Sequence, residues 1–115
     1  NIASPITAAE IGARLLLALE READGILHVV GADAVTRLEL AHLAAEVFDL
    51  DPALITPGPV PAGAMLPAPM PADTSLSTPR TDRVLGVVPH GIREQLSALR
   101  REVETGQVQP LTPTP

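Results

Sequence analysis

Apolar residues recur at helical spacing near the start of the chain, directly after a helix start signal. Thr7 and Glu10 have the spacing of a capping box, in which the threonine hydroxyl accepts from the glutamate amide and the glutamate carboxylate reaches back to the threonine amide. The pattern predicts a helix over residues 8–22 that ends at Asp24 and Gly25. Its expected apolar face consists of Ile11, Leu15, Ala18 and Leu19.

The same start signal returns at Thr36 and Glu39. The apolar positions that follow predict a second helix through about residue 48. Asp49 and the Asp51-Pro52 pair interrupt the pattern, so a turn is expected there.

Two further helices are expected in the second half of the chain. Thr78 is followed by proline, which is favoured at the first helical position, and this predicts a short helix that ends at Gly86. A last helix is expected to open at His90 or Gly91 and to stop at Gly106. Its apolar face would consist of Ile92, Leu96, Leu99 and Val103.

Residues 26–30 form a nearly continuous β-prone run between two glycines. Such a run is typical of a strand covered on both faces in a parallel sheet, with His28 buried and hydrogen-bonded. A single strand must pair with something, which could be the segment near Ile55, a second copy or another domain. An unpaired strand edge predicts self-association. The expected fold is therefore α/β, mostly helical, with one or two short strands that would join a parallel sheet.

Proline divides the rest of the chain. Residues 57–71 contain six prolines and two glycines, so a proline-rich loop is expected over 57–79. This loop would belong to one unit over residues 1–106. The tail over 107–115 contains three prolines and is expected to be disordered.

Composition excludes several classes of protein. The net charge is −6, all eight basic residues are arginines and the only aromatic residue is Phe48, which does not fit a nucleic-acid-binding surface. No apolar run approaches the roughly 20 residues that span a membrane. No signal peptide is visible and the chain begins with Asn1, so a piece of a longer cytoplasmic protein is expected.

Candidate chemistry within the chain is sparse. The three histidines are 14 and 48 positions apart, without the paired spacing of metal ligands. Asp49 and Asp51 lie beside a proline and fit a turn better than a carboxylate pair, and Ser75 and Ser77 have no evident base. Neither a catalytic nor a metal-binding residue is expected.

Two segments carry a family resemblance. Gly25-Ile-Leu-His-Val-Val-Gly31, followed by Val35-Thr-Arg-Leu-Glu-Leu-Ala41, resembles the C-terminal part of extended short-chain dehydrogenase/reductases, most closely the dTDP-4-dehydrorhamnose reductase branch. Pro71-Ala-Asp-Thr-Ser-Leu76 with Ser77-Thr-Pro-Arg80 is similar to that family's segment near the bound sugar nucleotide. The similarity rests on the order and spacing of these segments over residues 3–103.

The resemblance implies the substrate-binding lobe of a Rossmann-type reductase that uses NAD(P)H and reduces a nucleotide-activated sugar. The family's glycine-rich cofactor motif and its Tyr-x-x-x-Lys pair are absent, because the chain contains neither tyrosine nor lysine. The chain is therefore expected to be inactive alone and to depend on a missing N-terminal cofactor domain. The substrate-proximal residues that the resemblance implies are Met70, Pro71, Asp73, Ser75 and Arg80.

Two departures from the family pattern leave an alternative open. Met70 stands where the family has an arginine before proline, and a thioether cannot replace a guanidinium that binds phosphate. Ser77 stands where the family often has aspartate, although Arg80 could partly compensate. The alternative is a non-catalytic regulatory or protein-interaction module, similar to the regulatory subunit of methionine adenosyltransferase.

Overall fold

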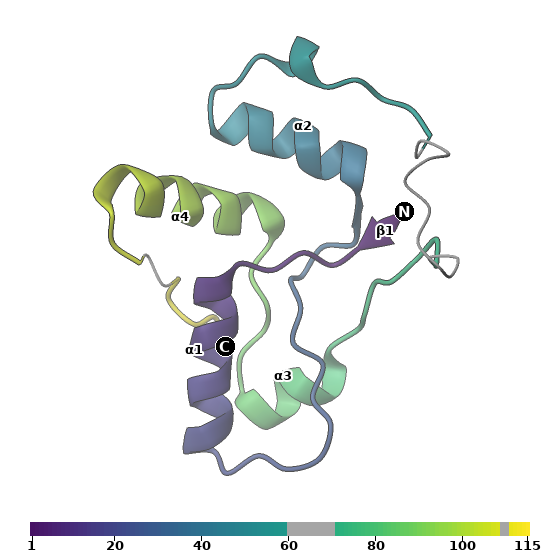
Figure 1. The fold of residues 1–115 in the computed structure, drawn as a ribbon. Helices are drawn as coiled ribbons and strands as arrows, with labels where there is room; N and C mark the ends of the chain where they lie inside the picture. The colour runs from purple at the N-terminus through teal and green to yellow at the C-terminus, as the bar shows by residue number, and fades with distance from the viewer. Residues whose placement is uncertain (60–70, 109–110) are drawn as a thin grey trace.

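The computed structural model describes residues 1–59, 71–108 and 111–115. The described part of the chain is a mostly helical α/β structure with four α-helices and one two-stranded sheet (Figure 1). The helices are α1 (Ala8–Glu20), α2 (Arg37–Val47), α3 (Pro79–Leu85) and α4 (Ile92–Thr105). The strands are β1 (Ile2–Ala3) and β2 (Val35–Thr36), and a 3-10 turn follows α2 at Pro52–Leu54.

All four predicted helices are confirmed, each within about two residues of its expected bounds. The α2 start is a complete capping box, in which Glu39 N donates to Thr36 Oγ1 at 3.1 Å and Thr36 N donates to Glu39 Oε2 at 2.6 Å. Proline at position 79 opens α3 as expected. Gly86 and Gly106 end α3 and α4 in the left-handed conformation, each with a φ of 70°, where glycine carries no steric penalty.

The predicted strand over residues 26–30 is wrong, because this segment is not in a strand. The observed sheet pairs β1 with β2 in antiparallel register, so the expected parallel sheet is wrong too. The only parallel pairing among the described residues is an isolated bridge between Ile2 and Asp73. Residues 26–30 lack a strand neighbour because side chains of α3 donate hydrogen bonds to two of their backbone carbonyls, as described below.

The apolar core is small and the face that α1 buries is polar. Buried apolar side chains come mainly from α4 and the segment before it, and they are Ala45, Leu85, Val87, Ile92, Leu96 and Ala98. On α1 the buried residues are Glu10 and Arg14, whereas Leu15 is 54% and Leu19 is 75% exposed. The predicted apolar face of α1 is therefore wrong at Leu15 and Leu19, whereas Ile11 and Ala18 are half-buried. Tertiary contacts bury the adjoining side of the helix, which carries Glu10 and Arg14.

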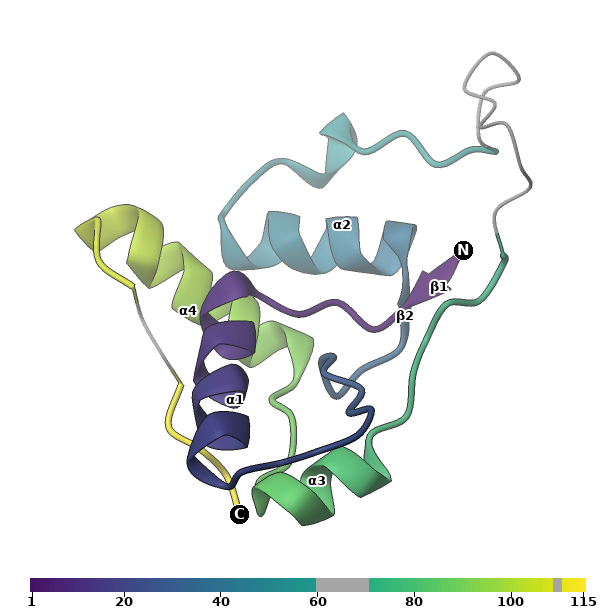
Figure 2. The ribbon, with the colours of Figure 1, turned by 60° about the horizontal axis from the view of Figure 1, so that its bottom comes forward.

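The helices lie in two pairs. Helix α2 packs against α4, and α1 packs against α3 (Figures 1 and 2). Gln95 joins the pairs, since its Oε1 accepts from Thr7 N at 2.8 Å. None of the helices in the described ranges combines the length and apolar character needed to cross a membrane.

Candidate functional site

An open groove of about 400 Å³ lies at the start of α3. We call it the α3 groove. The segment that follows α1 passes alongside α3 (Figure 2). Its lining combines side chains of α3 with residues from that passing segment and from the approach to the helix. These are Ile26, His28, Ser77, Thr78, Pro79, Arg80, Thr81 and Arg83.

Two neighbouring residues of α3 form one wall of the groove by holding the passing segment. Arg80 donates from Nη1 to Ile26 O at 2.5 Å and from Nη2 to the carbonyl of residue 24 at 3.2 Å. Thr81, which is buried, donates from Oγ1 to His28 O at 2.8 Å. Gly25 allows the close approach, because it has a φ of 74° and a Cβ there would lie 3.2 Å from Arg80 Nη2. Side chains therefore replace a strand neighbour for this segment.

The α3 groove is positively charged although the whole chain has a net charge of −6. Arg80 and Arg83 both line it, and no aspartate or glutamate is among its described lining residues. The carbonyl bonds of Arg80 use only part of its five N–H donors. Asp82 lies next to the groove, where its Oδ2 accepts from Thr78 Oγ1 at 3.1 Å. A planar guanidinium can bind phosphate or carboxylate through two parallel hydrogen bonds, so this lining suits an anion.

The structure brings only one of the predicted substrate-proximal residues into this groove. Arg80 lines it, whereas Pro71, Asp73 and Ser75 do not. Met70 lies outside the described residues. The other three lie beside β1, where Ile2 N donates to the carbonyl of residue 72 at 2.7 Å. Pro71 and Asp73 are exposed there, and Ser75 is half-buried.

Asp73 and Ser75 form a local turn. Asp73 Oδ1 accepts from Ser75 N at 2.9 Å. Hydrogen bonds from the side chain and then the backbone of Ser75 lower the pKa of the Asp73 carboxyl from its ordinary value of 3.8. This geometry is that of an Asx turn, and it accounts for both residues without a ligand.

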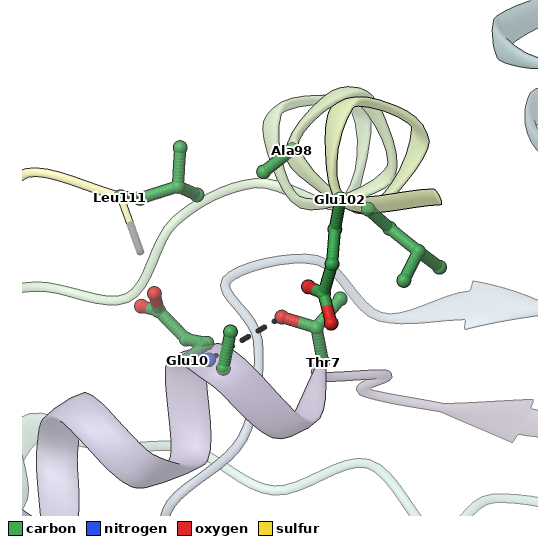
Figure 3. A pocket seen from close by; sticks show the side chains of 7 residues that line it. Thr7, Glu10, Ala98, Glu102 and Leu111 are labelled. Atoms are coloured by element: carbon green, nitrogen blue, oxygen red, sulfur yellow. Dashed lines mark hydrogen bonds between the residues drawn. The ribbon is translucent and has the colours of Figure 1, made fainter. Parts of the chain in front are cut away.

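A buried polar cluster, which we call the α1 cluster, lies away from the groove and consists of Glu10, Arg14 and His90. Glu10 Oε1 lies 2.8 Å from His90 Nδ1 and accepts from Arg14 Nε at 3.3 Å. All three side chains are less than 7% exposed. Figure 3 shows Glu10 with Thr7 at the start of α1, below Ala98 and Glu102 of α4.

The α1 cluster overturns half of the first predicted capping box. Glu10 N donates to Thr7 Oγ1 at 3.4 Å, as expected, but the Glu10 carboxylate is turned to His90 and Arg14. The Thr7 amide that it was expected to satisfy donates to Gln95 instead. Residues 10 and 90 are eighty positions apart, so no local pattern could reveal this pairing.

His28 was also misjudged from the sequence. It is exposed and lines the α3 groove, whereas the β-prone run around it predicted a buried position. A signal for the groove did exist, since Arg80 and Arg83 are three positions apart on a short helix and share one face.

No group of three or more acidic or histidine side chains with metal-binding geometry occurs within residues 1–59, 71–108 and 111–115. Ser77 and His28 both line the α3 groove, but no hydrogen bond joins them among the described residues. The two arginines in the lining make anion binding the chemistry that this groove supports best. Comparison with known proteins adds no relative, since no family model, no curated protein and no solved structure matches the chain.

Proposed function

We propose that this chain forms the substrate-binding portion of an NAD(P)-dependent reductase that acts on a sugar nucleotide. In this proposal the α3 groove holds the phosphate groups of the substrate. The observation that carries the proposal is the pair Arg80 and Arg83 at one open groove without a lining acid, in a chain whose net charge is −6. Arg80 also belongs to the segment whose sequence resembles the family's substrate side.

The chemistry would come from a separate cofactor-binding domain. The chain contains neither the tyrosine nor the lysine of the family's proton-donating pair. NAD(P)H would supply the hydride in that domain. The role of this chain would be to hold the sugar nucleotide in place, since the correct orientation of two reactants lowers the barrier of the step between them.

Calorimetry with dTDP-glucose and UDP-glucose tests the proposal, with the Arg83→Gln variant as the critical comparison. Arg83 is exposed and no hydrogen bond of its side chain occurs among the described residues, so its replacement leaves the groove wall intact. We expect saturable binding that Arg83→Gln weakens by about tenfold or more, because a charge-assisted hydrogen bond is worth about 1.5–3 kcal/mol.

Arg93→Gln provides the matched control. Arg93 is also exposed, but it lies on α4 and pairs with Glu46 at 2.8 Å. Its replacement should leave nucleotide-sugar affinity unchanged. Absence of binding for both nucleotide sugars, or equal losses in the two variants, would contradict the proposal.

A second candidate is a non-catalytic module that acts by protein contact. It is favoured by the row of exposed leucines on α1, where Leu15, Leu16 and Leu19 are 54%, 62% and 75% exposed. The reductase proposal could use the same leucine face for docking on a cofactor domain. The leucine face therefore does not separate the two candidates, whereas binding of a nucleotide sugar does. Failure of both nucleotide sugars to bind, together with leucine-dependent association, would favour the module.

A further inference from the structure

The described end of the chain is seated as an extended peptide against the segment before α4. Val88 N donates to Thr114 O at 2.8 Å in an isolated antiparallel bridge. His90 Nε2 lies 2.8 Å from Thr112 O. Both views place this end beside α1 (Figures 1 and 2). The two carbonyls are two residues apart, as on one edge of a β-strand.

Apolar side chains of residues 111–115 line small hollows that are formed by α1, α4 and the segment between α3 and α4. Leu111 and Pro113 line a small hollow with Leu17, Val87 and the α1 cluster. Leu111 also borders the neighbouring hollow that it shares with Glu10 and Ala98 (Figure 3). The seat is shallow, since Leu111 is half-buried and residues 112–115 are exposed. A segment held in this way can be displaced by a competitor.

The His90 ring has a hydrogen-bond partner on each side when the segment is seated. Thr112 O is a carbonyl, which only accepts, so Nε2 must carry a proton. On the other side of the ring, Nδ1 lies 2.8 Å from Glu10 Oε1, which also accepts from Arg14 Nε. Glu10 therefore fixes the ring of His90 from one side, and Nε2 donates to the seated segment on the other.

Few charged groups face His90. From α1 these are Glu10 and Arg14, and from α4 Glu102 lines the hollow next to Glu10 (Figure 3). The described residues 111–115 bring no charged side chain. Arg14 Nη1 is buried and has no hydrogen-bond partner among the described residues, so the cluster retains a donor that a ligand carbonyl could use.

We propose that Val88–His90 and the adjoining face of α1 form a recognition groove for an extended, uncharged, proline-containing peptide, with the His90 ring as its hydrogen-bonding anchor. Residues 111–115, Leu-Thr-Pro-Thr-Pro, are an internal ligand that blocks this groove in cis. The proposal is independent of anion binding, because the lining of the α3 groove shares no residue with this one.

Proline suits this groove for a chemical reason. The bound segment is held by two hydrogen-bond donors, which are Val88 N and the His90 ring. Proline lacks an N–H and therefore leaves no donor unpaired, while its carbonyl and those of its neighbours remain acceptors. Its restricted φ also favours the extended conformation that such grooves bind, at a low cost in entropy.

Fluorescence anisotropy with a labelled Leu-Thr-Pro-Thr-Pro peptide tests the proposal on the full chain. The double variant Leu111→Ser and Pro113→Ser weakens the seating of the internal ligand without changing the body. We expect this variant to bind the peptide at least about tenfold more tightly than the wild type, because a tethered competitor acts at a millimolar effective concentration. Equal affinity of the two proteins, or no binding by the variant, would overturn the proposal.

The anchor is tested in the same double variant. Adding His90→Leu should abolish peptide binding, whereas adding His42→Leu, at an exposed position of α2, should not change it. Adding His90→Gln instead should retain binding, because the glutamine amide can donate to the same carbonyl as the ring does. Thermal melts show whether each variant folds. Peptide binding by a folded His90→Leu protein, or loss of binding by a folded His90→Gln protein, would overturn the role of His90 as the anchor.

Discussion

Gly31 is the residue at which three distant parts of the chain meet. A Cβ at this position would lie 2.0 Å from Pro5 O, closer than real contacts allow, and 3.0 Å from Gln95 Nε2, which is a tight contact. The next residue, Ala32, donates its amide to His90 O at 3.1 Å. Glycine is needed here for close backbone approach, since its φ is not in the left-handed region.

Substitution of two glycines by alanine should have opposite effects. Gly31→Ala should destabilise the protein by about 1–3 kcal/mol or more, because the added methyl collides with backbone that cannot move aside easily. Gly12→Ala should stabilise it by about 0.5–1 kcal/mol, since Gly12 is in a helix interior with nothing within 4 Å of the new Cβ. Urea melts of the two variants measure both effects. Equal midpoints would contradict this account of Gly31.

At the scale of elements, two helices with the same start motif use it differently. Thr36 and Glu39 complete their capping box in an exposed setting. Thr7 and Glu10 share only one of the two bonds, because the Glu10 side chain instead contacts His90 and Arg14 in the buried α1 cluster. The motif therefore predicts where a helix begins, but burial decides what its glutamate contacts.

The exposed capping box should make the start of α2 sensitive to acid. Hydrogen bonds from the backbone and then the side chain of Thr36 lower the folded-state pKa of Glu39 below its ordinary value of 4.5. A lowered pKa in the folded state means that the stabilisation is present above pH 4.5 and is lost as the pH falls through the folded-state value. The wild type should therefore be more stable than Glu39→Gln at pH 7, and the gap should shrink below pH 4.5.

Thermal melts of both proteins from pH 7 to pH 3 measure this gap. Glu94→Gln, on the first turn of α4 and without a capping partner, controls for the loss of one negative charge. A difference in melting temperature between the wild type and Glu39→Gln that does not change with pH would contradict the stabilising role of the capping box. The same holds if it equals the difference for Glu94→Gln at every pH.

The whole molecule is open for its size. Its radius of gyration is 16.1 Å, compared with about 13 Å for a compact domain of this length. Its accessible surface is 7771 Å², compared with about 6,000 Å² for a compact monomer of 12.0 kDa. The surplus surface is partly apolar and includes the exposed leucines of α1. We expect this apolar face to be a contact surface.

We expect the chain to self-associate through α1. Sedimentation velocity should give a mass above 12.0 kDa that rises with concentration. Replacing Leu15, Leu16 and Leu19 by serine should restore a monomer, because it removes the apolar surface that drives association. Leu54→Ser, at a position 79% exposed in the 3-10 turn, is the matched control and should still associate. A wild-type protein that remains monomeric at all concentrations would contradict self-association through this face.

The α3 groove combines residues for which the sequence predicted different roles. Arg80, predicted to lie near a substrate, lines the groove together with His28, which was predicted in a buried strand. The substrate role of Arg80 stays a prediction. Pro71, Asp73 and Ser75 are close to Arg80 in sequence, yet they lie beside β1 and not in the groove. Proximity in sequence does not place side chains on one surface once the chain has turned.

Helix positions followed from the amino-acid pattern because the interactions that start and stop a helix act within about four residues. Thr36 with Glu39 and the terminating Gly86 and Gly106 are of this kind. The burial of Glu10 and the loss of the strand at 26–30 were decided by partners eighty and more than fifty positions away. Hydrogen bonds over such separations depend on how whole elements pack, and that packing leaves no periodic trace in the chain.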